Sequence, residues 1–147
     1  MKAILSAMAI AALALLLVAG AVFSLNDSTV LVPPPEAVAE GFARQLVAGR
    51  YERALPYLSR ELASEVGPDG LRALANQLKS LTGTVLNVQG EPGWMVGERA
   101  EAAATLETES AGQVRLIFPL SREQGVWSIS SLDRLELDTA RRDSTTE

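Results

Sequence analysis

The side chains that most often carry chemistry are partly missing from this chain of 147 residues, which contains no histidine and no cysteine. An imidazole base, a thiolate nucleophile, a disulfide and a Cys/His zinc site are therefore excluded. Among the carboxylates, Glu101, Glu107 and Glu109 alternate so that they share one strand face, where they could act as an acid and a base or bind a cation. The opposite face is apolar, so we interpret these glutamates as the solvated side of a sheet. The sequence predicts no enzyme, no metal site and no cofactor.

Three other side chains have both a functional and a structural interpretation. Asp69 follows a Gly-Pro pair and is expected to cap a helix rather than act as a base. Tyr57 could donate a hydrogen bond into a pocket, but packing at a helix end is the simpler role. Trp94 follows Pro92-Gly93 and either lies exposed at a rim, as part of a binding surface, or covers the sheet.

Five large apolar side chains form the candidate ligand site. They belong to a predicted helix and to two predicted strands, and could line an apolar cone between helix and sheet: Phe42, Leu46, Leu116, Phe118 and Trp127. The alternative is that the same five residues fill a solid core.

A long apolar segment lies near the start of the chain. Ala3 to Phe23 is 21 residues without a charge, which as a helix would be about 31 Å long and would span a bilayer. We interpret residues 1–25 as a transmembrane signal-anchor that contacts the lipid bilayer through residues 3–23; a cleavable signal peptide ending near Ala19-Gly20-Ala21 is the alternative. Lys2 precedes this segment and acidic residues follow it, which predicts a single-pass protein of the bacterial inner membrane with a cytoplasmic N-terminus and an extracytoplasmic, periplasmic domain.

The rest of the chain has the composition of one soluble domain. Residues 26–34 form a proline-rich spacer, residues 35–133 the domain, and residues 134–147 a polar tail that we expect to be disordered. The whole chain carries 13 basic and 18 acidic residues, for a net charge of -5. An acidic surface without a basic cluster argues against nucleic-acid binding.

Hydrophobic spacing divides the domain into helices and then strands. It predicts a helix that Pro35 opens and Gly49 ends, a short helix over residues 51–58, a loop over residues 59–66, and a third helix from Leu71 to Gly83. In the short helix, Pro56 must either lie near the first turn or bend the helix. From Thr84 the period becomes two, which predicts strands over residues 84–89, 113–120 and 126–132, and a long strand within residues 94–109, with a break at residues 90–93.

Two residues of the third strand give predictions about its neighbours. Arg115 should lie opposite a glutamate of the preceding strand. Pro119 should lie at an edge or a bulge. The fold class is α+β: after an N-terminal transmembrane helix, three helices pack on a curved, four-stranded antiparallel sheet.

Two sequence stretches resemble a known superfamily. Leu46-Val47-Ala48-Gly49-Arg50-Tyr51-Glu52-Arg53-Ala54-Leu55, followed by Leu58-Ser59, is similar to the junction of the first two helices in NTF2-like domains (SnoaL/ketosteroid-isomerase-like, cystatin-like fold), and Gly125-Val126-Trp127-Ser128-Ile129 resembles their closing strand. The resemblance covers residues 35–133 and implies a helix lying across a curved sheet. Catalytic members place Asp, His or Tyr inside the cone, and this sequence has no acid at an evidently inward strand position.

The expected function is that of a non-enzymatic, membrane-tethered module for protein interaction or envelope assembly. Its partner would be a second copy in a homodimer, or an envelope protein. The alternative is a domain that binds a small apolar ligand in the cone.

Overall fold

The computed structural model describes residues 31–133 and 137–139. The predicted transmembrane segment, residues 1–25, and most of the spacer and the tail lie outside the described residues. Within the described part, no helix is both long and apolar enough to cross a membrane. The described residues from Val32 onward cluster as one compact unit. Its elements follow in this order: α2 (Pro35–Val47), α3 (Tyr51–Ala54), the 3₁₀ turn η1 (Leu55–Tyr57), α4 (Arg60–Thr82), β1 (Val85–Val96), β2 (Arg99–Thr108), β3 (Gly112–Glu123), β4 (Val126–Ile129) and β5 (Leu137–Thr139).

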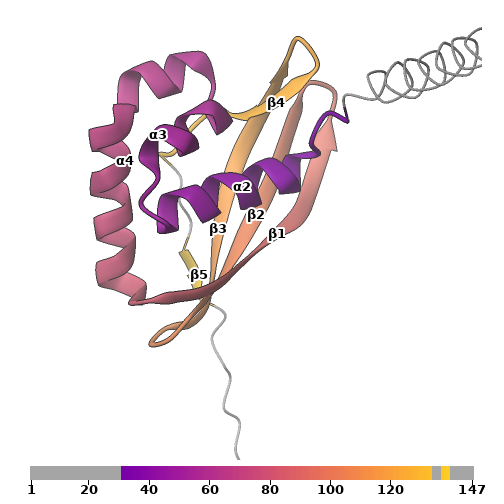
Figure 1. The fold of residues 1–147 in the computed structure, drawn as a ribbon. Helices are drawn as coiled ribbons and strands as arrows, with labels where there is room; N and C mark the ends of the chain where they lie inside the picture. Colours follow the sequence, from indigo (N-terminus) through magenta and orange to yellow (C-terminus); the bar gives the residue numbers. More distant parts are fainter. Residues whose placement is uncertain (1–30, 134–136, 140–147) are drawn as a thin grey trace, which may run out of the picture. The chain divides into compact units, whose positions relative to one another are not determined.

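Helix α2 lies across the inner face of the sheet (Figure 1) and begins and ends as predicted. Pro35 occupies the first turn, where its missing N–H costs nothing, and Glu36 lies near the positive end of the helix dipole. Gly49, just beyond the end of α2, has φ +73°, which a residue with a side chain rarely adopts. The buried stripe of α2 is Val38, Ala39, Phe42, Ala43 and Leu46.

The second helical segment changes type where proline occurs. Helix α3 is only one turn long, and Pro56 lies in the first turn of η1, where a proline is tolerated. After η1 the chain meets the sheet through a parallel bridge between Leu58 and Ile129, and the Ser59 N–H donates to the Ile129 carbonyl at 2.9 Å.

Helix α4 corrects the predicted loop over residues 59–66, because it begins at Arg60. Ser59 caps it by accepting a hydrogen bond from the Leu62 N–H at 3.3 Å. The helix is interrupted at Gly67, with φ 63° and ψ 178°. The expectation that Asp69 caps a helix is wrong: its carboxylate is almost fully exposed and lies 3.9 Å from Arg72, an ion pair within one turn.

The sheet is antiparallel, with the order β1-β2-β3-β4, and β5 also pairs with β3. The predicted break at residues 90–93 is wrong, whereas the long strand predicted within residues 94–109 corresponds to β2. Strand β1 continues through Pro92 to Val96, and the chain turns at Gly97, φ +58°, before β2. An edge strand tolerates proline because one row of its backbone donors needs no partner, and the register shifts between Pro92 and Met95 as in a bulge.

Pro119 lies in β3 at a point where the strand is paired with another strand on one side only. Strand β4 pairs with β3 from Leu120 onward, whereas β5 pairs with residues 114–116, so Pro119 lies between these two ladders. There its carbonyl accepts a bond from the Ser130 N–H at 3.0 Å. The expectation of a local edge is confirmed.

The disordered tail predicted for residues 134–147 needs a correction, because Leu137–Thr139 form β5 on β3.

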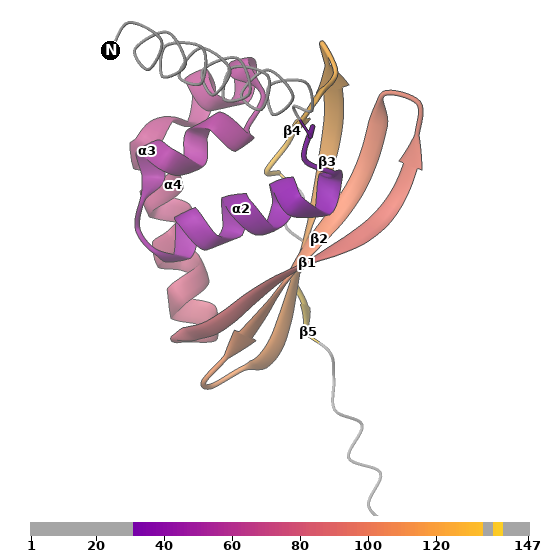
Figure 2. The ribbon, with the colours of Figure 1, turned by 45° about the vertical axis from the view of Figure 1, so that its right-hand side comes forward.

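The core lies between α2 and the inner face of the sheet. Inner side chains alternate along β2 and β3: Ala102, Ala104 and Leu106, then Val114, Leu116, Phe118 and Leu120. Gly90 permits close packing of α2 on β1, because an added Cβ would collide with the Glu36 carbonyl and lie 3.0 Å from the Glu40 Cβ. Figure 2 shows α2 crossing this face while α4 stands to one side.

Candidate functional site

The five predicted ligand-site residues are all buried. The rings of Phe42 and Phe118 meet edge to face with their centroids 5.5 Å apart. Trp127 is only 6% exposed and stacks with the Arg122 guanidinium, 5.4 Å from the ring centroid. Phe42 and Trp127 therefore belong to the packed core.

The other three residues, Leu46, Leu116 and Phe118, line a cavity of about 270 Å³, here called the cone cavity. Helix α4 and the segment after β4 supply the rest of its lining: Leu74, Gln77, Leu78, Leu81, Leu132 and Asp133. Seven of these nine residues are apolar, and the two polar ones offer an amide and a carboxylate. The α4 residues of this lining lie in the third predicted helix, but none of them was among the five predicted ligand-site residues.

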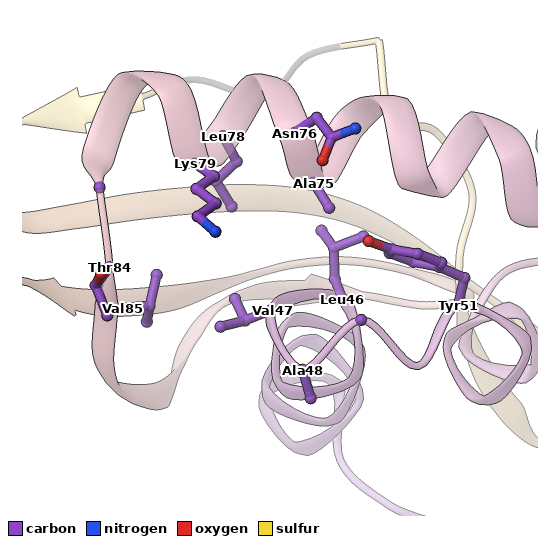
Figure 3. Close-up of a pocket in the computed structure, with 12 residues that line it drawn as sticks. Leu46, Val47, Ala48, Tyr51, Ala75, Asn76, Leu78, Lys79, Thr84 and Val85 are labelled. Carbon is purple, nitrogen blue, oxygen red and sulfur yellow. The ribbon is translucent and has the colours of Figure 1, made fainter.

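A second hollow, here called the α4 cleft, lies between α4, the end of α2 and the start of β1 (Figure 3). Its volume is about 330 Å³, and Leu46 and Leu78 line it as well as the cone cavity. Figure 3 shows the Lys79 ammonium and the Tyr51 hydroxyl reaching into the space between the helices. The α4 cleft thus differs from the cone cavity in offering a cation and a hydroxyl above an apolar floor.

The outer face of the sheet carries a third hollow of about 480 Å³, here called the outer groove. Ile117 and Pro119 lie on its floor by the alternation of β3, while Trp94 lies at one end and is 50% exposed. Arg99 and Glu101 are neighbours on the same face of β2, and within the described residues neither forms an ion pair. Trp94 is therefore half-exposed at the end of this groove, and its part in a binding surface stays a prediction.

Beside the outer groove, an ion pair joins β3 to β1. Arg115 contacts the Glu91 carboxylate at 3.1 Å. The sequence predicted a glutamate of the preceding strand, but Thr105 occupies the opposite position in β2. The correct partner lies one strand further away, because a long arginine side chain can reach diagonally across a small neighbour.

The polar junction between α2 and β1 holds the helix in place. The Glu40 carboxylate accepts a hydrogen bond from the Gly90 N–H at 3.0 Å and pairs with Arg44, four residues further along the helix, at 2.9 Å. The bond from Gly90, followed by the bond from Arg44, lowers the pKa of Glu40. Arg44 also donates to the Val88 carbonyl at 2.7 Å. This junction serves structure.

The glutamates of the sheet and Tyr57, the other side chains considered for chemistry, lie on the solvent-exposed side of the sheet or in packing contacts. In the described part of the chain, no group of three His, Cys, Asp or Glu side chains is placed to hold a metal ion. Glu107 and Glu109 are exposed, and Glu101 is half-buried on the outer face. Tyr57 packs on Gly41, where an added Cβ would lie 2.7 Å from the tyrosine oxygen, as expected for a packing role.

Comparison with known proteins identifies the fold. No protein-family model matches the chain, and no curated protein does. Among solved structures, the chain is similar to a Campylobacter jejuni protein described as an NTF2-like transpeptidase, with 17% identity and a TM-score of 0.54 over 67% of this chain and 99% of that one. The domain therefore has an NTF2-like fold, as the sequence resemblance implied. At this identity the likeness concerns the fold alone.

Proposed function

We propose that this chain is a non-enzymatic module, tethered to a membrane by residues 3–23, whose extracytoplasmic domain docks to a second copy through the outer face of its sheet. The observation that carries the proposal is the outer groove, in which an arginine and a glutamate without ion-pair partners in the described structure lie beside an apolar floor.

The arrangement is self-complementary. In a two-fold dimer each contact occurs twice, so Arg99 of one copy can face Glu101 of the other and the reverse. Ile117 and Pro119 would lose water when the two faces meet, which supplies the non-directional part of the attraction. A shared membrane raises the effective concentration of the two domains, so a weak interface is sufficient.

Cross-linking through one engineered cysteine tests this dimer. The chain has no cysteine of its own, so Ser121→Cys places one thiol in the outer groove and Ser80→Cys places a control thiol on exposed α4. In membranes containing the full chain, oxidation should yield a covalent dimer from the first variant and not from the second.

Charge exchange tests the pairing itself. Arg99→Glu or Glu101→Arg in the Ser121→Cys background should lower the dimer yield, because each change places like charges face to face, and the double exchange should restore it. Equal yields from all four proteins, or from the Ser80→Cys control, would contradict docking through this face.

The cone cavity favours a second function, the binding of a small apolar ligand. Its seven apolar side chains surround a volume close to the lower end of that found for ligand pockets. Native mass spectrometry of the purified chain should then show a bound molecule. Leu74→Trp, which fills the cavity, should remove that molecule, whereas Leu86→Trp on the exposed part of β1 should not. Unliganded wild-type protein that also takes up no added fatty acid would refute this function.

A further inference from the structure

We infer that the end of the domain where α2 begins lies against the lipid bilayer, with Trp94, Met95 and Val96 inserted among the lipid headgroups. These three residues, together with Val126, are here called the hairpin tip. The inference rests on the membrane tether of the proposed function, but not on self-association or on ligand binding.

The first support is exposure. Met95 is 62% exposed and Val96 is 72% exposed, and both lie next to half-exposed Trp94 at the end of the β1–β2 hairpin. Val126 lies beside the β3–β4 turn and is also exposed. Isolated exposed apolar residues are ordinary, but a cluster at one end of a domain indicates a contact with a partner or a membrane.

The second support is the position of this cluster relative to the start of the domain. The Glu36 carbonyl lies against Gly90, and β1 continues from Gly90 towards Val96, so the first turn of α2 faces the tip half of the hairpin. Figure 1 and Figure 2 both show the start of α2 at the same end of the sheet as the β1–β2 and β3–β4 turns.

The third support is the length of the chain before α2. The uncharged segment ends at Phe23, and residues 24–34 separate it from Pro35. Eleven residues can span at most about 40 Å when fully extended, and two further prolines, Pro33 and Pro34, stiffen the connection. A membrane held by residues 3–23 is therefore within reach of the end of the domain where α2 begins, and so of the hairpin tip.

The hairpin tip is also held in place before it meets any partner. The Arg122 N–H donates to the Glu98 carbonyl at 2.9 Å, and the Arg122 guanidinium binds the Glu98 carboxylate at 2.9 Å. This bond lowers the pKa of Glu98 and raises the pKa of Arg122, so both side chains stay charged at neutral pH. Their opposite charges largely cancel each other at the tip. The partner that fits is a surface that accepts apolar side chains and an indole without needing strong charge, which is the headgroup region of a zwitterionic bilayer.

Tryptophan fluorescence in vesicles provides the test, because the chain has only two tryptophans and Trp127 is buried. The full chain is reconstituted at low protein-to-lipid ratio into phosphatidylcholine vesicles, with or without bromine near the top of the acyl chains. In a Trp127→Phe variant, bromine should reduce the emission of Trp94 by about half, as expected for an indole at the lipid interface. In Trp94→Phe, the emission of Trp127 should hardly change. If Trp127→Phe does not fold, the difference between wild type and Trp94→Phe gives the same quantity.

A matched pair of surface variants shows whether the tip causes the quenching. Met95→Ser with Val96→Ser should reduce the quenching of Trp94 at least twofold, whereas Leu86→Ser should leave it unchanged. Leu86 is a suitable control because it is 63% exposed, like Met95, but lies at the opposite end of β1.

The outcomes separate the inference from the tether on which it rests. If the chain floats with the vesicles but Trp94 is quenched no more than Trp127, the tip does not touch lipid and the inference is overturned while the tether stands. If the chain does not float with vesicles, the tether is refuted and the inference falls with it. Quenching that the serine variants leave intact also overturns the inference.

Discussion

Replacing Gly90 by alanine tests the closest approach between helix and sheet. The added Cβ would collide with the backbone carbonyl of Glu36, which cannot move aside as a flexible side chain would. Gly90 does not have a positive φ, so the substitution carries no conformational penalty and isolates the steric effect. Overpacking costs about 1–3 kcal/mol, and disturbing the hydrogen bond from the Gly90 N–H to Glu40 adds about 1 kcal/mol.

The expected loss of about 2–4 kcal/mol is a large fraction of the roughly 5–15 kcal/mol that stabilises a domain. In urea unfolding of residues 32–147 followed by circular dichroism, the midpoint should fall by roughly 1–3 M. Gln89→Ala, at the neighbouring exposed position, should change stability by less than about 0.5 kcal/mol. If Gly90→Ala unfolds at the same urea concentration as Gln89→Ala, α2 does not approach β1 as closely as described.

Three further predictions concern the junction, the core and the helix break. Glu40→Gln should reduce stability by up to about 1 kcal/mol at neutral pH, since the side chain is partly exposed. Because folding lowers the pKa of Glu40, the difference from wild type should shrink as the pH falls below about 4.3, and a difference that grows towards acid would contradict the sign. Phe118→Ala should cost about 3–5 kcal/mol, and a double-mutant cycle with Phe42→Ala should give a coupling of about 0.5–1.5 kcal/mol; additive effects would rule out a ring contact. Gly67→Ala should cost about 1–3 kcal/mol, because φ 63° with ψ 178° is essentially confined to glycine, while nothing lies within 4 Å of the added Cβ; an unchanged thermal midpoint would show that α4 is not broken there.

The sequence predicted helices and strands correctly where one face of the element is buried and the opposite face is exposed to solvent. The stripe of α2 has a clear helical period because the helix lies between the sheet and solvent. The apolar face predicted opposite the glutamates of β2 is clear for the same reason, and its residues Ala102, Ala104 and Leu106 are buried. The first part of α4 was missed because residues 60–66 are largely polar or only partly buried, so no strong period marks them.

The hairpin was misplaced because local and tertiary signals disagree. Pro92 and Gly93 have the composition of a turn, yet they lie within an edge strand, and the turn occurs at Gly97. Whether a strand lies at an edge depends on the order of all the strands in the sheet. It cannot be deduced from the seven residues 90–96 alone. The cavities have the same limitation: the sequence indicated which side chains point inward, but an unfilled space depends on how far α4 stands from the sheet.

Helix α4 is fixed at both ends and supported less in between. At its start the Ser59 N–H bonds to Ile129, and at its end the Ser110 hydroxyl donates to the Thr82 carbonyl at 2.9 Å. Leucines in the intervening span close the cone cavity. The contacts that hold the two ends of α4 therefore do not involve the residues that line the cone cavity. Substitutions of the side chains that line the cone cavity could enlarge or shrink it over evolutionary time. Related chains could then hold ligands of different size while α4 keeps its position.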